Sequence, residues 1–292
     1  MKELKIKGKI DTNVSLKQLT TYKLEGTSKY VIYPNDTKEL IKIIKELKEQ
    51  NKKYKIIGGG SNLIFKGNYD GYLIKLDKLD NLKIDGNKII VGAGYSTIRL
   101  AYKVSKMGLS GLEFATGIPG TIGGAIFNNA GAYGSDMGYI VESIKVLTPD
   151  LEIKTMYNKE LDFHYRTSFL KKNKDYICLE ATIILKNGNK ENIMEIIEDR
   201  KQRRMMSQPL EYPSAGSVFR NPPDDSAWRL IEGIGYKGKN IGGAKVSEKH
   251  ANFIINYNNA SGEDIIKLIN EIKEKVKEKY NVELILEQEI VE

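Results

Sequence analysis

Apolar and polar positions near the N-terminus follow the pattern of a strand and then of an amphipathic helix. Residues 29–34 (KYVIYP) read as the strand, and Asp36 is placed to cap a helix that continues to about Gln50. Residues 54–65 (YKIIGGGSNLIF) then read as a strand, a glycine turn and a second strand. The pattern therefore predicts a small β-α-β unit over residues 31–76.

Strands and helices continue to alternate as far as the C-terminus. The expected helices cover residues 97–107, 190–206, 226–231 and 263–280. The expected strands cover residues 82–91, 143–147, 153–157, 177–185, 251–255 and 282–290, with a further strand near Ser217. No internal repeat or low-complexity linker interrupts this order, and the fold class that we expect is α+β. We place a break near residue 200, between a region 1–200 (subdomains of about 1–80 and 81–200) and a region 201–292.

The stretch Phe114–Ser135 is the longest in the chain without a formal charge, which raises the question of a membrane span. A spanning helix needs roughly 20 mostly apolar residues. This stretch instead contains six glycines, a proline and the adjacent Asn128 and Asn129. Each glycine costs a helix about 1 kcal/mol relative to alanine, and amides without partners are unfavourable in hydrocarbon. We therefore expect loop and turn backbone that lies close against another group, and no membrane association.

Composition narrows the class of protein further. The chain has 292 residues, 40% of them hydrophobic and 29% charged, which is ordinary for a globular protein. The N-terminal segment has no apolar signal core, and the single cysteine, Cys178, rules out an internal disulfide. We expect a cytoplasmic location on these grounds. Only His164 and His250 accompany that cysteine, so no metal site is expected.

The net charge of +8 suggests nucleic-acid binding, but the distribution of charge argues against it. In residues 38–55 and 263–280, acidic and basic residues alternate at helical spacing, which is typical of solvated helix faces. No contiguous basic face with interleaved aromatic residues is present. A denser basic group lies near the end of an expected helix and consists of Arg200, Lys201, Arg203 and Arg204. These cations either interact favourably with the C-terminal end of the helix dipole or bind a phosphorylated small molecule.

Two glycine motifs are far apart in the sequence: GGGSN at residues 58–62 and GIPGTIGG at residues 117–124. Neither is a Walker loop, and neither reads G-x-G-x-x-G at the start of a helix. Glycines allow successive backbone N–H groups to face one anion. The motifs are therefore either a diphosphate cradle without a lysine or two ordinary tight turns. In a cradle, additional side-chain donors would come from Ser61, Asn62, Thr116 and Thr121.

Seven stretches, in one order along almost the whole chain, carry a family resemblance: LTTYKLEG, IIGGGSNLIF, LEFATGIPGTIGGAIFNNAGAYG, FHYRTS, SQPLEYPSAGSVFRNP, IGGAKVSEKHANFIIN and VELILEQEI. They resemble the UDP-N-acetylenolpyruvoylglucosamine reductase (UDP-N-acetylmuramate dehydrogenase) family, flavoenzymes of peptidoglycan precursor synthesis. The resemblance implies that residues 1–200 form an FAD-binding fold of the vanillyl-alcohol-oxidase (PCMH) type and that residues 201–292 form a substrate-binding domain. It implies a cofactor cradle made of Gly58, Gly59, Gly60, Ser61, Asn62, Leu63, Thr116, Gly117, Pro119, Gly120, Thr121, Gly123 and Gly124. No histidine adjoins either glycine turn, so we expect the FAD to be non-covalent.

The reaction that the resemblance implies is the NADPH-dependent reduction of UDP-N-acetylglucosamine enolpyruvate to UDP-N-acetylmuramate. Hydride passes from NADPH to flavin N5 and on to the enolpyruvyl β-carbon, and the α-carbon receives a proton. Such a reaction needs donors for the substrate carboxylate and a positioned acid. The motif HYRTS places the family's arginine at Arg166, for which the alternative is a surface pair with Asp162. The motif SAGSVFRNP places the proton donor at Ser217, with Ser214 as the rival.

The third catalytic position falls in the last expected strand. Family members commonly read L-x-P-E-V-R there, and residues 284–289 of this chain read LILEQE. This alignment places the catalytic glutamate at Glu287, although the proline is absent and Glu289 replaces the usual arginine. Both glutamates would face the same side of a strand, so Glu289 remains an alternative.

The resemblance also implies contacts with the substrate by Tyr133 and Asn221. The chain between Arg166 and Ser217 lacks a tyrosine-bearing insertion found in one family branch, so this chain resembles the branch without that lid. Arg204 or Arg220 is expected to bind the substrate diphosphate. Another FAD oxidoreductase of the same fold is the alternative, but SAGSVFRNP and SEKHANFIIN favour the reductase. We expect small-molecule partners only, and a monomer.

Overall fold

A computed structural model describes residues 6–292 and divides the chain into two compact units. Unit 1 comprises the described residues up to Asp11, with Tyr30–Gly59 and Gly71–Gln202; unit 2 comprises Thr12–Lys29, Gly60–Asp70 and Arg203–Glu292. The first five residues of the expected N-terminal region lie outside the described residues. The division into regions 1–200 and 201–292 stays a proposal, because unit 2 also takes in two segments from the first seventy residues.

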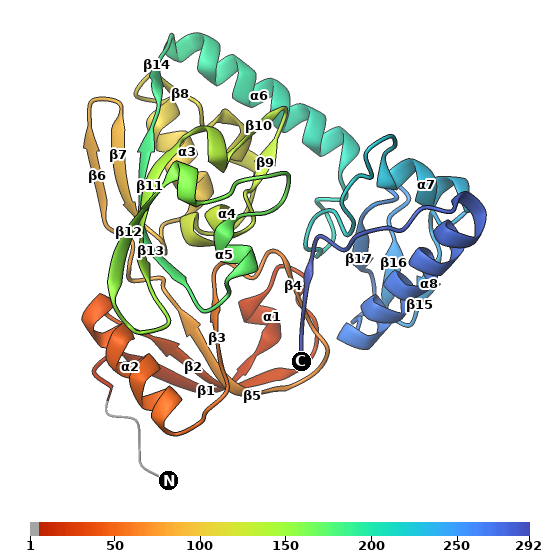
Figure 1. The fold of residues 1–292 in the computed structure, drawn as a ribbon. Helices are drawn as coiled ribbons and strands as arrows, with labels where there is room; N and C mark the ends of the chain where they lie inside the picture. Colours follow the sequence, from red (N-terminus) through yellow and green to blue (C-terminus); the bar gives the residue numbers. More distant parts are fainter. Residues whose placement is uncertain (1–5) are drawn as a thin grey trace. The chain divides into compact units, whose positions relative to one another are not determined.

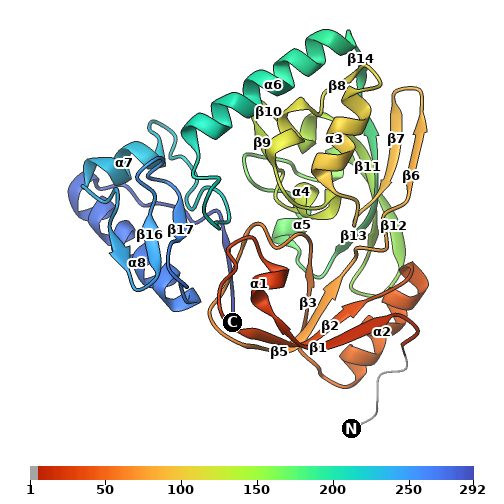
Figure 2. The ribbon, with the colours of Figure 1, turned by 180° about the vertical axis from the view of Figure 1, so that it is seen from behind.

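A five-stranded antiparallel sheet forms the centre of unit 1 (Figure 1). Its strands, in spatial order, are β12 (Ile153–Tyr157), β11 (Val141–Leu147), β13 (Ile177–Ile184), β7 (Lys88–Gly92) and β6 (Leu82–Asp85). Both ribbon views show α3 (Thr97–Ser105) and α4 (Ile122–Phe127) beside this sheet (Figures 1 and 2). The inward residues of sheet and helices share one core with Leu100, Val104 and Ile126.

The expected β-α-β unit is confirmed. Strand β2 (Thr27–Tyr33) precedes α2 (Thr37–Glu49), and Asp36 caps that helix by accepting a hydrogen bond from the Glu39 N–H at 2.8 Å. Strand β3 (Tyr54–Ile57) then pairs in parallel with β5 (Tyr69–Lys75). The full sheet has the order β1-β2-β5-β3, in which β1 is Lys9–Ser15.

Unit 2 has a smaller antiparallel sheet, β15 (Asn240–Ile241), β16 (Ala244–Val246) and β17 (Ile254–Asn256), packed with α7 (Ala227–Gly233) and α8 (Gly262–Tyr280). Strand β4 (Leu63–Phe65) pairs in parallel with the last strand, β18 (Glu289–Val291). The long helix α6 (Lys190–Ser207) runs from unit 1 into unit 2. The remaining short elements are α1 (Leu16–Leu19), α5 (Phe169–Lys172), β8 (Leu109–Ser110) paired with β14 (Lys186–Asn187), β9 (Gly131–Ala132) paired with β10 (Ser135–Asp136), and single 3-10 turns at 113–117, 137–139 and 158–160.

Four sequence-based expectations are wrong in detail. The strand near Ser217 is reduced to one bridge, and the expected strand 282–290 is regular only at its end, because the intervening residues bond to several different segments. The strand expected at 251–255 starts only at Ile254, since the Phe253 N–H closes a turn onto the His250 oxygen. Part of the charge-free stretch is helical: burial of Ile122 and Ile126 outweighs the low helix propensity of its glycines.

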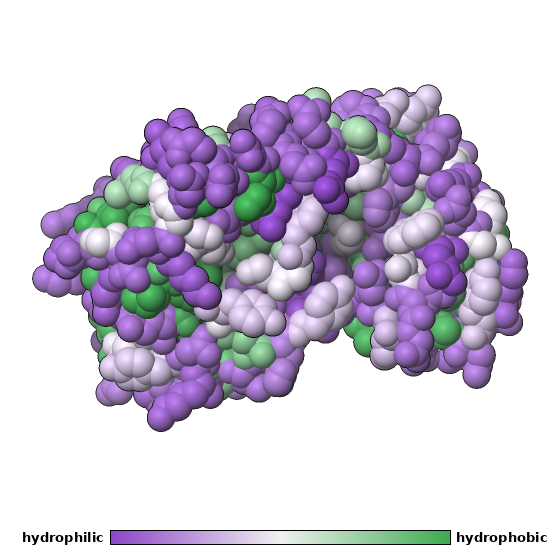
Figure 3. All heavy atoms as spheres, turned by 90° about the horizontal axis from the view of Figure 1, so that it is seen from above, coloured by the Kyte–Doolittle hydropathy of each residue, from purple (hydrophilic) through white to green (hydrophobic). Residues whose placement is uncertain are grey.

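The face of the molecule drawn in Figure 3 carries mainly hydrophilic side chains. On the face drawn in Figure 3, hydrophobic residues occur between hydrophilic ones. No helix within residues 6–292 combines the length and the apolar character that crossing a membrane requires.

The single cysteine lies in the core of unit 1. Cys178 is on β13 and is 6% exposed, and burial raises the pKa of its thiol to about 12. The thiolate is the reactive form of cysteine. The raised pKa therefore keeps the thiol protonated and unreactive at pH 8 in the folded state.

We therefore expect the folded protein to react with a thiol reagent only through unfolding. Titration with an aromatic disulfide at pH 8 should count no fast-reacting thiol in native protein and one thiol in 6 M guanidinium. Rapid labelling of the native protein would contradict the burial of Cys178.

Candidate active site

The two glycine motifs are in direct contact within unit 1. A Cβ atom added to Gly59 would lie 2.8 Å from the Gly120 Cα, and one added to Gly58 would lie 2.6 Å from the Thr121 Oγ1. Separations under 3.0 Å are essentially never seen for real Cβ atoms. Both positions therefore require glycine unless the facing turn moves.

Two amides of the second motif are engaged within the protein. The Gly123 N–H donates to the Ala93 oxygen at 2.9 Å, and the Gly124 N–H donates to the Thr121 Oγ1 at 3.4 Å. A Cβ on Gly123 would lie 3.0 Å from the Ala93 Cβ. The ligand-facing amides expected at these positions are thus bonded to protein acceptors, and Gly123 also allows α4 to pack closely against Ala93.

Other amides of the same contact have no internal acceptor. The N–H groups of Gly59, Gly120 and Thr121 donate to no atom of residues 6–292. Because Gly59 touches Gly120, these donors gather at one place on the backbone. Unpaired N–H groups gathered in this way can bind an anion. The expected Thr116 donor differs, since its hydroxyl donates to the Glu113 oxygen at 3.0 Å.

The end of the first motif holds the C-terminal segment of unit 2. The Asn62 Nδ2 donates to the Glu287 oxygen at 3.1 Å, and the Glu289 N–H donates to the Asn62 oxygen at 2.9 Å. Leu63 is the β4 partner of Glu289. Gly60 has φ +65°, and a Cβ there would collide with the Leu19 carbonyl oxygen. Asn62 and Leu63 therefore fix the main chain at Glu287 and at Glu289, on either side of Gln288.

Arg166 lies at the tip of a tight turn in unit 1. The His164 and Thr167 backbones exchange hydrogen bonds of 3.1 and 3.0 Å, and Arg166, between them, has φ +56°. The Asn129 Nδ2 anchors the turn by donating to the His164 oxygen at 2.9 Å. A left-handed conformation is unfavourable for arginine and is frequent at functional sites. The guanidinium carbon lies 5.3 Å from the Tyr165 ring centroid.

The neighbouring carboxylate, Asp162, has partners of its own. It accepts a hydrogen bond from Lys172 and another from the His164 Nε2 at 2.8 Å. The hydrogen bond from Lys172, followed by the one from His164, lowers the pKa of the Asp162 carboxyl below its ordinary value. This group therefore stays ionised at neutral pH and is no proton donor.

Tyr133 is attached to α6. Its hydroxyl donates to the Arg200 oxygen at 3.2 Å, and the Arg200 guanidinium carbon lies 4.7 Å from the ring centroid. The side chain remains 44% exposed. Arg200, one member of the basic group, therefore lies over an aromatic ring. A second member, Lys201, pairs with Glu198, with 3.4 Å between its Nζ and the Glu198 Oε2.

Ser217 and Glu287 are held on paired segments of unit 2. The Glu287 N–H donates to the Val218 oxygen at 2.8 Å, and Phe219 forms an antiparallel bridge with Leu286. Glu287 therefore lies opposite the residue that follows Ser217. Both side chains are half-buried. No described residue of unit 2 hydrogen-bonds to the Ser217 hydroxyl, so this group is available to a ligand.

A buried asparagine fixes the other edge of the Ser217 segment. Asn252 is 4% exposed; its Nδ2 donates to the Phe219 oxygen at 2.8 Å, and its Oδ1 accepts from the Phe219 N–H at 2.9 Å. The Val218 N–H donates to the Asn252 carbonyl at 2.9 Å. The sequence analysis missed this role, although Asn252 lies in the quoted stretch SEKHANFIIN.

Two of the expected substrate residues follow Ser217 in the same unit. The Arg220 N–H donates to the Ile285 oxygen at 2.9 Å, while its Nε is buried with no hydrogen-bond partner within residues 6–292. An unpaired buried guanidinium nitrogen is unfavourable unless an anion binds there. The Asn221 Oδ1 accepts from the Ala227 N–H at 3.1 Å and so helps to start α7.

The structure assigns the expected site residues to both units. Unit 1 holds Gly58, Gly59, Thr116, Gly117, Pro119, Gly120, Thr121, Gly123, Gly124, Tyr133 and Arg166. Unit 2 holds Gly60, Ser61, Asn62, Leu63, Arg204, Ser217, Arg220, Asn221 and Glu287. Within units, the glycine motifs meet, and Ser217 meets the Glu287 segment.

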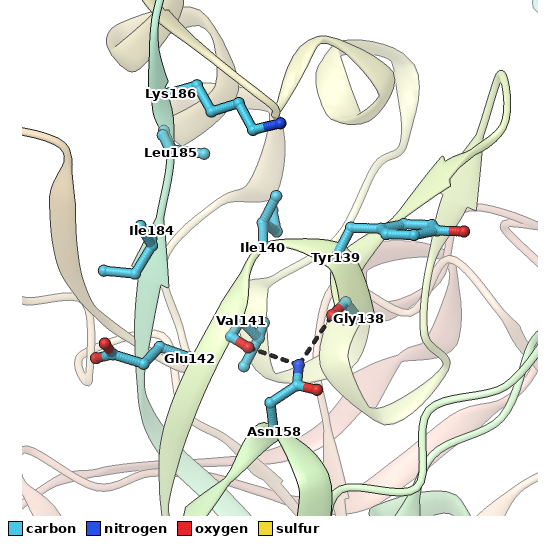
Figure 4. Close-up of a pocket in the computed structure, with 9 residues that line it drawn as sticks. All are labelled: Gly138, Tyr139, Ile140, Val141, Glu142, Asn158, Ile184, Leu185 and Lys186. Carbon is cyan, nitrogen blue, oxygen red and sulfur yellow. Dashed lines mark hydrogen bonds between the residues drawn. The ribbon is translucent and has the colours of Figure 1, made fainter.

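A surface hollow elsewhere in unit 1 has none of these residues in its lining. It measures about 360 Å³ and is bordered by β11 and β13 (Figure 4). The Asn158 amide closes one side by donating to the Gly138 and Val141 oxygens at 2.8 and 2.7 Å. No group of three or more metal-ligating side chains occurs in the part of the chain that the structure describes.

Two family models match the chain. Residues 208–291 match the model described as UDP-N-acetylenolpyruvoylglucosamine reductase, C-terminal domain, and residues 28–157 match the FAD binding domain. The UDP-N-acetylenolpyruvoylglucosamine reductase of Bacillus subtilis is 43% identical over 286 residues, which are 97% of this chain and 94% of the relative. That of Caldanaerobacter subterraneus is 45% identical over 293 residues, 100% of this chain and 96% of the relative.

Solved structures confirm the expected α+β fold. The crystal structure of UDP-N-acetylenolpyruvylglucosamine reductase from Thermus caldophilus has a TM-score of 0.82 and 30% identity, and the match covers 98% of this chain and 100% of that one. The 6-hydroxy-D-nicotine oxidase of Arthrobacter nicotinovorans has a TM-score of 0.51 at 14% identity, covering 64% and 44%. The second likeness extends to the fold alone.

Asn252 allows a test of how unit 2 holds the Ser217 segment. Asn252→Ala leaves the buried Phe219 N–H and oxygen without partners, so we expect a loss of about 2–4 kcal/mol in the free energy of unfolding. Urea unfolding of both proteins measures it. Asn258→Ala, at an exposed position, is the control and should change stability by less than about 0.5 kcal/mol. Equal effects would show that the Asn252 bonds do not hold the segment.

Proposed function

Because the chain belongs to the UDP-N-acetylenolpyruvoylglucosamine reductase family, we propose that it reduces UDP-N-acetylglucosamine enolpyruvate to UDP-N-acetylmuramate with NADPH as the reductant. The observation that supports this most directly is the pairing of the Ser217 and Glu287 segments within unit 2. This pairing places the Ser217 hydroxyl and the Glu287 carboxylate on two segments that are hydrogen-bonded to each other. The product is a precursor of peptidoglycan, and the proposed location is cytoplasmic.

The chain binds FAD, and the contact between the two glycine turns fits such a cofactor. We assign the diphosphate to the N–H groups of Gly59, Gly120 and Thr121, which lack internal acceptors among residues 6–292. Gly58, Gly60 and Gly123 allow neighbouring parts of the chain to approach closely. When bound, FAD provides hydride transfer from the reduced nicotinamide to the substrate. We infer that it is held non-covalently.

Ser217 is the proposed proton donor to the α-carbon. A serine hydroxyl is a weak acid, so its position and surroundings must supply most of the effect. Its hydroxyl is free within unit 2, and the main chain on both sides is tied to neighbouring segments. Glu287, whose N–H is bonded to the Val218 oxygen, is the proposed carboxylate partner in proton transfer.

Cationic side chains account for the binding of an anionic substrate. We propose that Arg166 binds the enolpyruvyl carboxylate, since a planar guanidinium matches a carboxylate with two parallel hydrogen bonds. Arg220 and Arg204 are the proposed ligands of the diphosphate. The buried Nε of Arg220 has no hydrogen-bond partner within residues 6–292, so it can donate to a phosphate oxygen. Asn221 and Tyr133 are proposed to contact the rest of the substrate.

The glycine contact predicts which substitution removes the cofactor. Gly59→Ala places a Cβ 2.8 Å from Gly120, so the turns must separate and the purified protein should contain little flavin. Gly67→Ala is the matched control, because nothing lies within 4 Å of the added Cβ. Absorbance near 450 nm relative to 280 nm measures flavin content. Full flavin content in Gly59→Ala would show that this contact is not part of the cofactor site.

Ser217→Ala tests the proposed reaction by separating its two halves. Reduction of the protein-bound flavin by NADPH needs no proton from Ser217 and should keep a near-normal rate. Reoxidation by the enolpyruvyl substrate should slow by about 10²–10⁴-fold, the usual contribution of a general acid. Ser214→Ala should be much milder. Stopped-flow absorbance follows both steps, and equal slowing of the two would mean that Ser217 shapes the flavin pocket and donates no proton.

A further inference from the structure

Gln288 makes a set of contacts that neither the family resemblance nor the proposed reaction requires. The side chain is 4% exposed and lies between Glu287 and Glu289. Its Nε2 lies 3.1 Å from the Ala215 oxygen, 3.1 Å from the Gly216 oxygen and 3.4 Å from the Ser217 oxygen. One amide group therefore faces three successive carbonyl oxygens of the turn that carries Ser217.

The orientation of this amide follows from the groups around it. Three carbonyl oxygens can only accept hydrogen bonds, so the NH₂ end of Gln288 must face them. The Oε1 is then left to accept, and it does so from the Tyr22 hydroxyl at 3.1 Å. Tyr22 is fully buried, and this burial raises the pKa of its hydroxyl well above the ordinary value. The tyrosine hydroxyl thus stays protonated and remains a donor at neutral pH.

The turn that Gln288 holds would otherwise be weakly defined. Gly216 has φ +75°, and no heavy atom lies within 4 Å of a Cβ placed there. Packing therefore does not define the turn at Gly216, and glycine itself is permissive. The nearest other main-chain bonds of the segment are at Pro213, whose oxygen accepts from the Asn256 N–H at 2.8 Å, and at Val218. Ala215 packs in the core of unit 2, and the Gln288 amide is the hydrogen-bonding group that holds the carbonyl oxygens of residues 215–217.

We propose that Gln288, oriented by Tyr22, is a positioning residue that sets the direction of the Ser217 hydroxyl. The inference rests on the proposed role of Ser217 as proton donor. The same residue that follows Glu287 in the chain thus ties the serine turn to the glutamate segment. A donor that must reach one carbon of the substrate loses rate when its direction drifts, and a displacement of about 1 Å can cost about 100-fold.

The test uses the flavin-loaded protein and the variant Gln288→Met, which keeps the length of the side chain and removes both amide functions. Flavin reduction by NADPH should be near normal, and reoxidation by the enolpyruvyl substrate should slow by about 10- to 100-fold. Substrate KM should change little. Ile269→Val, a core substitution in α8 of the same unit, is the control for a general loss of stability and should leave both rates unchanged.

A double variant separates positioning from a merely structural role. If Gln288 acts through Ser217, then Gln288→Met should add no further slowing in the Ser217→Ala background. Additive slowing there, or equal slowing of the NADPH step in the single variant, would overturn the inference. If Ser217→Ala is itself harmless, the proposed proton donor falls and this role of Gln288 falls with it. A slow Ser217→Ala beside a normal Gln288→Met would remove the inference alone.

A readout without catalysis completes the test. Hydrogen exchange followed by mass spectrometry should show faster exchange in the peptide spanning residues 213–219 of Gln288→Met, with α8 unchanged. If Gln288→Met does not fold, Tyr22→Phe replaces it in this measurement. Tyr22→Phe removes only the hydroxyl and should give the same pattern of exchange more weakly. Unchanged exchange of that peptide in the folded variant would contradict the proposal that Gln288 holds residues 215–217 in place.

Discussion

The pairing of residues 217–220 with the C-terminal segment is the interaction on which the chemistry proposed for unit 2 depends. It consists of a few backbone hydrogen bonds, among them Glu287 N–H to the Val218 oxygen, and it joins parts of the chain that are far apart in sequence. Backbone bonds impose a register, so the identity of the residue next to Ser217 is set by the pairing. Asn252 on one side and Gln288 on the other satisfy the carbonyl and amide groups that this short pairing leaves open. The result is a serine on a turn with few conformations available to it.

At the contact between its two glycine turns, unit 1 is constrained chiefly by the main chain. Gly59 and Gly120 approach so closely that a Cβ at Gly59 would lie 2.8 Å from the Gly120 Cα, and the N–H groups left unpaired within residues 6–292 gather at that contact. Elsewhere in the same unit, Asn129 anchors the turn that places Arg166 in a left-handed conformation. Polar amides that bind main-chain carbonyls thus position the candidate groups in both units.

Much of this could be predicted from the sequence, and the reasons for the failures are physical. Periodicity gave the long helices and the central strands, and the spaced glycines indicated close backbone approach. The roles of the Asn129, Asn252 and Gln288 side-chain amides could not be predicted, because these amides bond to backbone carbonyl oxygens. Every residue has such an oxygen, so no sequence pattern indicates which one is the partner. The sequence predicts one long strand over residues 282–290. Its hydrogen bonds instead go to several separate segments, so only residues 289–291 are regular.

The most direct measurement of the central claim mixes the purified protein with NADPH and UDP-N-acetylglucosamine enolpyruvate and follows the absorbance of the reduced nicotinamide at 340 nm. The account predicts that NADPH is consumed only when the enolpyruvyl sugar is present, in a one-to-one ratio, and that the sugar product gains the mass of two hydrogens. Consumption at the same rate without the sugar, or a sugar recovered unchanged, would contradict the account.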